Sequence, residues 1–169
     1  SSQDAKALVL ATGAAAPGTP TTTISGISNA GAVVTAYLVN PDGSSGAVLG
    51  TSGATNSGGE FSVSLSSAPT GWVRLVSRGG KISREADLSE HPVESMELVA
   101  PFVTSSFNFL KISPVIDVAA RIMSYKAKTG STLADAFKFG MARTLQLDMA
   151  NVLLQDDISV YFSMLKGSI

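Results

Sequence analysis

The sequence predicts a mainly β chain with a C-terminal α region: a β-sandwich over residues 21–100, then a connector and helical region over residues 101–169. The first observation is a set of apolar-rich runs separated by proline, asparagine, aspartate and glycine, which is how short antiparallel strands are joined. The second observation is that helix-forming residues and charges take over after Ala100. The apolar-rich runs are Gly31–Val39, Phe61–Leu65 and Trp72–Ser77.

Residues 1–20 precede the predicted sandwich as a strand and a linker. Ala7–Ala11 is a short apolar run that favours a strand, and Gly13–Pro20 is rich in small residues typical of a linker. Two interpretations stay open: an edge strand or loosely held terminus of its own domain, or a donor strand that completes the sheet of a neighbouring subunit. An unpaired apolar strand promotes aggregation, so we expect this strand to pair. The candidate interaction residues here are Leu8, Val9 and Leu10.

A succession of strands is predicted for the β region. Phe61–Leu65 alternates cleanly, which places its three apolar residues on one buried face. Asn40–Gly43 predicts a turn, because proline fixes φ and glycine accepts positive φ. Gly79–Gly80 predicts another turn, and Arg74 is expected to point outward. The predicted strands are Thr22–Ile27, Ala32–Val39, a weaker strand around Ala47–Leu49, Phe61–Leu65, Trp72–Val76, Lys81–Ala86 and Met96–Ala100.

The C-terminal region predicts a buried aromatic connector and two or three amphipathic helices. Phe107 and Phe109 are expected to be buried in the connector. Ser113 and Pro114 suit the cap and first position of a helix, and Gly130 suits the position just beyond its end. The expected apolar stripe of this helix is Val115, Val118, Ala119, Ile122 and Met123.

Two further apolar stripes follow along the chain. Thr132 begins a sequence that resembles a capping box, and Asp156-Asp157 favours the start of a third helix. We expect the stripes to pack on each other, on the sandwich or on a partner, and Ile158, Phe162 and Leu165 are candidate interaction residues. The second stripe is Leu133, Ala136, Phe137, Gly140, Met141 and Leu145, and the third is Ile158, Tyr161, Phe162 and Leu165.

Two segments of the β region resemble a known family. Gly31–Tyr37 and Thr55–Val63 are similar to the carboxypeptidase-regulatory-like family of Ig-like or transthyretin-like β-sandwich modules. That family shows a strand of the form A-x-V and, after a turn, T-D-x-x-G-x-F; Asn56 stands here where the family usually has aspartate. The resemblance spans about residues 21–100 and implies an exported module with no catalytic residues to transfer. Lys111–Ala119 is similar to the helical segments that follow such modules in large bacterial exported lipoproteins.

Composition and titratable residues argue against an enzyme. The net charge of −1 gives no attraction for nucleic acid or an anionic membrane, and the absence of cysteine excludes disulfides, thiolate zinc sites and a cysteine nucleophile. His91 is the single histidine and no Gly-x-Ser-x-Gly elbow exists, so no Ser-His-Asp triad is predicted. We predict no cofactor and no metal. The acidic loops lack EF-hand spacing, but their carboxylates leave calcium binding open.

No apolar run reaches the ~20 residues of a spanning helix. Trp72 is expected in the core.

The sequence therefore predicts a non-catalytic structural or protein-interaction module of the bacterial cell surface. It would be exported, with its signal segment removed, and would form part of an envelope assembly or filament through strand edges and helix faces. The alternative is a carbohydrate- or ligand-binding module of an exported lipoprotein, which would use exposed aromatic residues.

Overall fold

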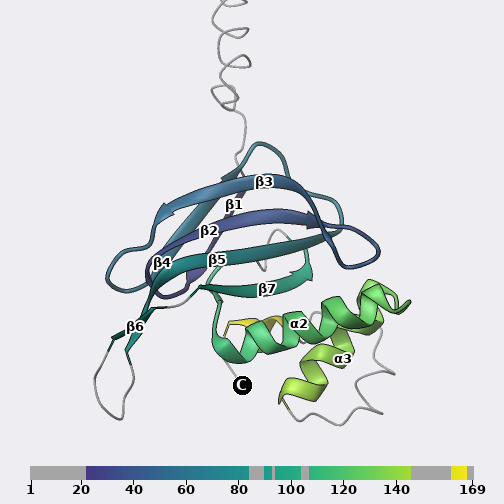
Figure 1. Cartoon of the computed structure of the whole chain (residues 1–169). Helices are drawn as coiled ribbons and strands as arrows, with labels where there is room; N and C mark the ends of the chain where they lie inside the picture. The colour runs from purple at the N-terminus through teal and green to yellow at the C-terminus, as the bar shows by residue number, and fades with distance from the viewer. Residues whose placement is uncertain (1–21, 84–89, 93, 104–106, 146–160, 167–169) are drawn as a thin grey trace, which may run out of the picture.

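The computed structural model describes residues 22–83, 90–92, 94–103, 107–145 and 161–166. Over these residues the chain forms two β-sheets followed by helices, so the prediction of a mainly β chain with a C-terminal α region is confirmed. Figure 1 shows the larger sheet lying over helices α2 and α3. In the ranges described, no helix is long and apolar enough to cross a membrane.

The larger sheet is antiparallel and has β5 at its centre. Its strand order is β3-β2-β5-β6, and β7 also pairs with β5. β5 is long enough to pair with β7 along its first half and with β6 near its end. The strands are β2 (Ala30–Val39), β3 (Ser45–Ala54), β5 (Trp72–Ser83), β6 (Glu90–Pro92) and β7 (Ser95–Pro101).

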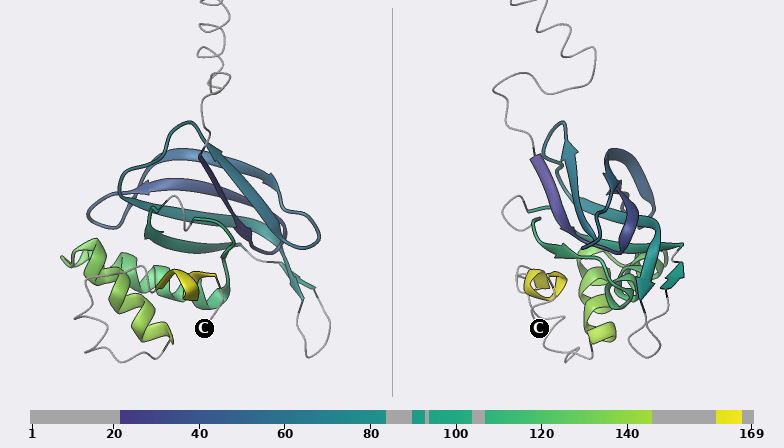
Figure 2. Two further views of the ribbon diagram at one scale, coloured as in Figure 1. Left: turned by 180° about the vertical axis from the view of Figure 1, so that it is seen from behind. Right: turned by 90° about the vertical axis from the view of Figure 1, so that its left-hand side faces the viewer.

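The smaller sheet has the order β4-β1-β8 and stands against the larger one, as the right-hand view of Figure 2 shows. β1 and β4 are antiparallel, whereas β8 runs parallel to β1, with Gly26 opposite Leu110. A side chain on Gly26 would collide with the carbonyl of Leu110, so this close approach requires glycine. The strands are β1 (Thr22–Ile27), β4 (Glu60–Leu65) and β8 (Leu110–Lys111).

Two strands differ in how they are buried. β4 alternates as predicted, with Phe61, Val63 and Leu65 buried and the residues between them exposed. β5 is instead buried continuously over residues 73–77, because the smaller sheet covers one of its faces and α2 covers the other. The prediction that Arg74 points outward is therefore wrong: this residue is 5% exposed and lies between the sheet and α2.

The predicted turn at Gly79–Gly80 is also wrong. β5 continues through both glycines to Ser83, with φ of 77° and 81°, and stays paired with β2 on either side of them. Because glycine tolerates positive φ, the strand can bend here without losing its partner. The part of the predicted Lys81–Ala86 strand beyond residue 83 lies outside the described residues.

Helix α2 begins and ends, and helix α3 begins, at the residues the sequence marks; the predicted start of the third helix at Asp156-Asp157 lies outside the described residues. The Ser113 side chain accepts a hydrogen bond from the Ile116 backbone N–H at the start of α2, and Gly130 follows its C-cap at Thr129 with φ of 111°. The Thr132 side chain accepts a hydrogen bond from the Asp135 N–H at the start of α3. The helices are α2 (Pro114–Lys128), α3 (Leu133–Leu145) and the short α5 (Tyr161–Leu165).

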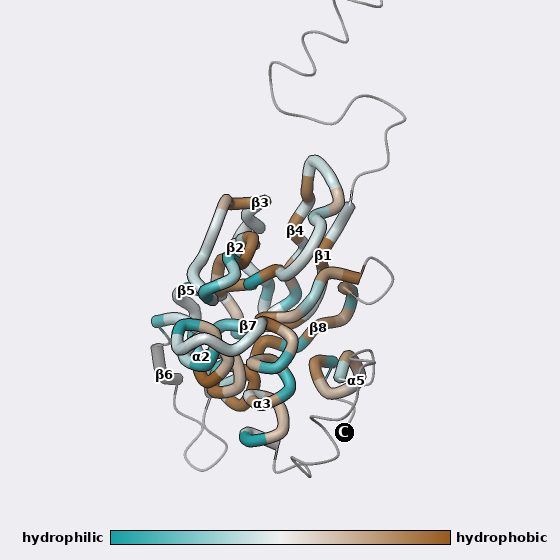
Figure 3. The backbone as a smooth tube through the Cα atoms, turned by 90° about the vertical axis from the view of Figure 1, so that its right-hand side faces the viewer, coloured by the Kyte–Doolittle hydropathy of each residue, from teal (hydrophilic) through white to brown (hydrophobic). Residues whose placement is uncertain are grey.

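One buried hydrophobic cluster includes residues of both sheets, the connector and the three helices. Figure 3 shows hydrophobic stretches facing one another between β7, β8 and the helices. Phe107 is fully buried in this cluster as predicted, whereas Phe109 is 77% exposed, so the prediction that Phe109 is buried is wrong. Phe109 has φ of 56°, and this left-handed backbone breaks the extended alternation on which the prediction relied.

Only two of the five residues in the predicted apolar stripe of α2 are buried. Ala119 and Met123 are buried, but Val115 and Val118 are 50% and 48% exposed and Ile122 is half-buried. The inner face of α2, which contacts the sheet and α3, is Ile116, Ala119, Ala120, Met123 and Ala127.

Candidate functional site

The predicted interaction residues do not form an exposed surface among the described residues. Leu8, Val9, Leu10 and Ile158 lie outside the described ranges. Phe162 and Leu165 are 5% and 1% exposed and belong to the core of their own chain.

Helix α5 shows why these two residues are buried. The ring of Phe162 lies 6.0 Å from that of Phe107 in the connector, and the ring of Tyr161 lies 5.3 Å from that of Phe137 on α3. α5 therefore lies against both the connector and α3, and Figure 3 shows it beside α3 and close to β8. The side chains of Tyr161, Phe162 and Leu165 therefore contribute to the core of their own chain.

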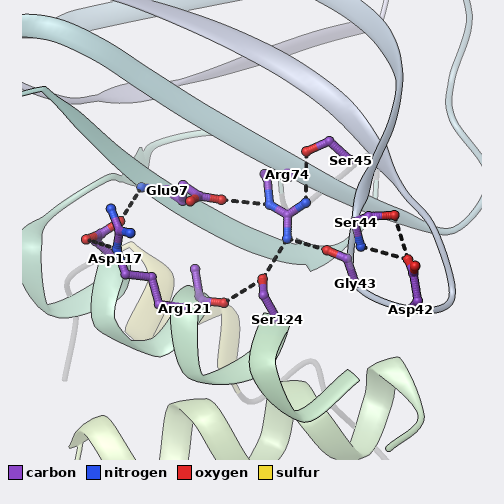
Figure 4. Close-up of polar contacts among 10 residues, drawn as sticks. Asp42, Gly43, Ser44, Ser45, Arg74, Glu97, Asp117, Arg121 and Ser124 are labelled. Carbon is purple, nitrogen blue, oxygen red and sulfur yellow. Dashed lines mark hydrogen bonds and ion pairs between the residues drawn. The ribbon is translucent and has the colours of Figure 1, made fainter. Parts of the chain in front are cut away.

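The clearest polar site lies between the larger sheet and α2, where Arg74 connects four segments (Figure 4). Its Nη1 donates to Ser45 Oγ at 2.9 Å, and its Nη2 donates to the Gly43 carbonyl at 2.6 Å and to Ser124 Oγ at 2.7 Å. Its Nε lies 2.7 Å from Glu97 Oε1. The Nε–H is not aligned with that oxygen as a hydrogen bond requires, so this contact is an ion pair held by charge.

Asp117 extends the polar site along the first turns of α2. One of its carboxylate oxygens accepts the Glu97 backbone N–H at 2.8 Å, and the other accepts Arg121 Nε at 2.9 Å. The hydrogen bond and the negative charge of Asp117 raise the pKa of the Arg121 guanidinium above its ordinary value. The N-terminal half of α2 is thus hydrogen-bonded to β7, and its C-terminal half is hydrogen-bonded to β5.

The β2–β3 turn supplies the third side of the site. Asp42 accepts hydrogen bonds from the side chain and backbone N–H of Ser44, and these bonds lower the pKa of the Asp42 carboxyl below its ordinary value. Gly43 has φ of 86°, and a Cβ there would lie 2.9 Å from Ala127 Cβ of α2. The turn therefore rests directly on the helix and presents the Gly43 carbonyl to Arg74.

The chemistry of this site is structural. The charged groups of Arg74, Glu97 and Asp117 are each bound to another part of the chain, so their contacts hold α2 on the sheet. Sequence reasoning missed it because it assigned Arg74 to an exposed face. The available signal was an arginine in the middle of the apolar segment 72–76, since a charge in a strand covered on both faces needs a partner.

A second feature is a groove at the end of the larger sheet, where β2 ends and β5 begins. Its volume is about 540 Å³, and we call it the Trp72 groove. The indole of Trp72 is half-buried, and its ring lies 5.4 Å from that of Phe137 in the core. Trp72 was predicted in the core, but part of it lines this groove. The lining residues are Leu38, Val39, Asn40, Pro41, Thr70, Gly71, Trp72, Thr132, Leu133 and Ala134.

The third feature is the outer face of α2, formed by Val115, Val118, Ile122 and Tyr125. Val115, Val118 and Tyr125 are 50%, 48% and 67% exposed, and Ile122 is half-buried. Their spacing of three, four and three residues places them in one row along the helix. Apolar residues scattered singly are ordinary on a surface, whereas a continuous row is typical of an interaction site.

Among the described residues, the side chains considered for metal binding do not gather into a metal site. The described ranges hold no group of three or more histidine, cysteine, aspartate or glutamate residues placed to bind a metal ion. His91 lies in β6, where its backbone pairs with Ile82 of β5. Asp87, Asp156 and Asp157, which the sequence left open for calcium, lie outside the described residues.

Comparison of the chain with protein-family models, with curated proteins and with solved structures found no match. The resemblance to carboxypeptidase-regulatory-like modules therefore stays a prediction that rests on the two segments described above.

Proposed function

We propose that this chain is a non-catalytic interaction module of the bacterial cell surface that associates with a second copy of itself through the outer face of α2. The observation that carries the proposal is the exposed apolar row on this helix. The Arg74 contacts support it indirectly, because they hold α2 rigidly on the sheet and so fix the position of that row.

The spacing of the row favours a second copy as the partner. In an antiparallel pair of α2 helices related by a two-fold axis near residue 120, Val115 would lie level with Tyr125 of the other copy. Val118 would likewise lie level with Ile122. Every residue of the row would then meet another residue of the row, which is the self-complementary arrangement that a two-fold interface requires.

The finer fold assignment belongs to the same proposal. We propose that residues 21–100 are an Ig-like or transthyretin-like β-sandwich, supported by two facing, mostly antiparallel sheets and by the segments that resemble that family. Modules of this kind act as scaffolds, which agrees with an interaction role carried by the helix.

Sedimentation velocity tests the proposal. We expect the wild-type chain to dimerise as its concentration rises, and Val118→Glu to shift the equilibrium to monomer, because a carboxylate would be desolvated at the centre of the interface. Val48→Glu on β3 is the matched control, since Val48 is a 60% exposed valine outside the row. The proposal would be contradicted if the wild-type chain stayed monomeric. It would also be contradicted if Val118→Glu and Val48→Glu weakened dimerisation equally.

Disulfide trapping tests the orientation. The chain has no cysteine, so single-cysteine variants are unambiguous. Mixing Val118→Cys with Ile122→Cys under mild oxidation should give the mixed dimer as the main product. A mixture of Val48→Cys and Ile122→Cys should give only background. Disulfides formed mainly between two copies of the Val118→Cys variant would refute the register with its two-fold axis near residue 120.

A further inference from the structure

The Trp72 groove offers a mainly apolar, uncharged surface. Every lining residue is uncharged. Two of its three polar side chains serve local turns: the Asn40 amide donates to Ser44 Oγ at 3.0 Å, and the Thr132 hydroxyl accepts the Asp135 N–H at 3.2 Å. A volume of about 540 Å³ is enough for a few side chains. The groove therefore suits an uncharged segment with adjacent apolar residues, and it suits an ionic ligand poorly.

The chain itself carries such a segment immediately before β1. Residues 7–21 contain no charged residue and include the apolar residues Leu8, Val9 and Leu10. This segment enters the described structure at Thr22, whose strand partner is Leu65. Thr70, which lines the groove, follows Leu65 after only a short loop.

The distances allow the segment to reach the groove of its own chain. Paired strand residues lie about 5 Å apart, and five residues span at most about 18 Å. Thr22 is therefore within about 23 Å of Thr70. The chain from Thr22 back to Leu10 spans about 40 Å when extended, which is ample.

We propose that Leu8, Val9 and Leu10 bind in the Trp72 groove of the same chain. Leu133 and Pro41 would contact these side chains together with the exposed part of the Trp72 indole. The short connection favours the chain's own segment over that of a second copy, because such a tether gives an effective concentration in the millimolar range. The inference is independent of the proposed role of the outer α2 face.

Trp72 reports directly on this contact because it is the only tryptophan. The experiment compares acrylamide quenching and the emission maximum of the wild-type chain with those of the variant Leu8→Ser, Val9→Ser, Leu10→Ser. We expect this variant to be quenched more strongly and to emit at longer wavelength, because the indole would lose its apolar cover. The matched control is Ala14→Ser, Ala15→Ser, Ala16→Ser in the linker, which should behave as wild type.

A second variant probes the groove side. Thr70→Lys places a charge at the exposed rim and should raise quenching in the wild-type background. In the triple-serine background the same change should have little additional effect, because the segment has already left the groove. Full additivity of the two changes would overturn the proposal.

Three other outcomes would also overturn it. Equal quenching in the wild-type chain and the triple-serine variant would show that residues 8–10 do not cover Trp72. Protection that disappears on dilution would assign the groove to the segment of a second copy. A blue shift of the wild-type emission on adding neutral oligosaccharides would instead show a groove open to sugars.

Discussion

Helix α2 contacts the rest of the molecule in two different ways. Toward the sheet it is held by polar contacts. Its Ser124 accepts a hydrogen bond from Arg74, and its Asp117 accepts one from the backbone of Glu97 in β7. Toward α3 it is held by close packing. Gly140 brings the two backbones so near each other that a Cβ there would lie 2.5 Å from the Ala119 carbonyl oxygen. The polar contact fixes the orientation of the helix, and the apolar contact fixes its distance from α3.

This difference predicts different responses to mutation. A polar contact with several partners fails when one buried charge is left alone, whereas a close-packed contact fails when volume is added. Each contact can therefore be broken separately, and the size of each effect shows how much of the stability depends on it.

The largest effect is expected for Arg74→Met. The substitution removes three hydrogen bonds and leaves Glu97, with 23% of its side chain exposed, without its cation. Because that carboxylate keeps some access to water, we expect a loss of about 3 kcal/mol in the free energy of unfolding, at the low end for a broken buried pair. Urea unfolding measures this loss.

Two variants control the Arg74 prediction. Arg78→Met removes an exposed arginine of the same strand that lies 5.7 Å from the Tyr37 ring centroid, and it should cost only about 0.5 kcal/mol. The double variant Arg74→Met, Glu97→Met should recover part of the loss, because an apolar pair replaces the ionic one. If Arg74→Met cost no more than Arg78→Met, the polar contact would not hold the helix.

An intermediate effect is expected for Gly140→Ala on the apolar side of α2. In an unhindered helix this change stabilises by up to about 1 kcal/mol. Here the added methyl group meets the Ala119 backbone, so we expect a destabilisation of about 1–3 kcal/mol. Gly53→Ala on β3 is the control, since a Cβ at that position would have no atom within 4 Å, and it should be neutral or slightly stabilising. A stabilised Gly140→Ala variant would show that the helices can separate at no cost.

The smallest effect is expected for Tyr161→Phe, and its sign is opposite. The Tyr161 hydroxyl is buried without a hydrogen-bond partner among the described residues. Removing it should raise the free energy of unfolding by about 1 kcal/mol, as thermal or urea unfolding at neutral pH would show. Tyr125→Phe, at a 67% exposed position, should have no effect.

The same variant has a distinct pH dependence. Burial raises the pKa of Tyr161 above its ordinary value of 10.0. Above pH 10 the unfolded chain releases this proton while the folded chain still retains it, so the wild type loses stability as pH rises through the folded-state pKa. The stability gain from Tyr161→Phe should therefore grow above pH 10. A constant difference between the two proteins would contradict this.

The sequence predicts most strands because their signals are local. The alternation at Phe61–Leu65 and the turn at Asn40–Gly43 depend only on neighbouring residues, and both occur as predicted. The caps at Ser113 and Thr132 are likewise set within one helical turn. These features form as predicted because no contact with a distant part of the chain favours a different local structure.

The features that sequence reasoning missed depend on distant contacts or on a single backbone angle. Arg74 is buried because α2, formed much later in the chain, covers the outer face of β5. Phe109 is exposed because its positive φ reverses the expected side. α2 carries apolar residues on two adjoining faces, and periodicity alone could not decide which of them is buried. The Trp72 groove combines three separated segments, so no local pattern marks it.

The pairing of β8 with β1 has a consequence for how the chain folds as it is synthesised. Gly26 finds its parallel partner Leu110 only after the entire larger sheet has been made. Contacts between residues so far apart in sequence form slowly, because a long loop must close before they contribute any stability. Until then that edge of β1 has no partner from the described part of the chain, and a nascent β1 would benefit from a chaperone that shields it.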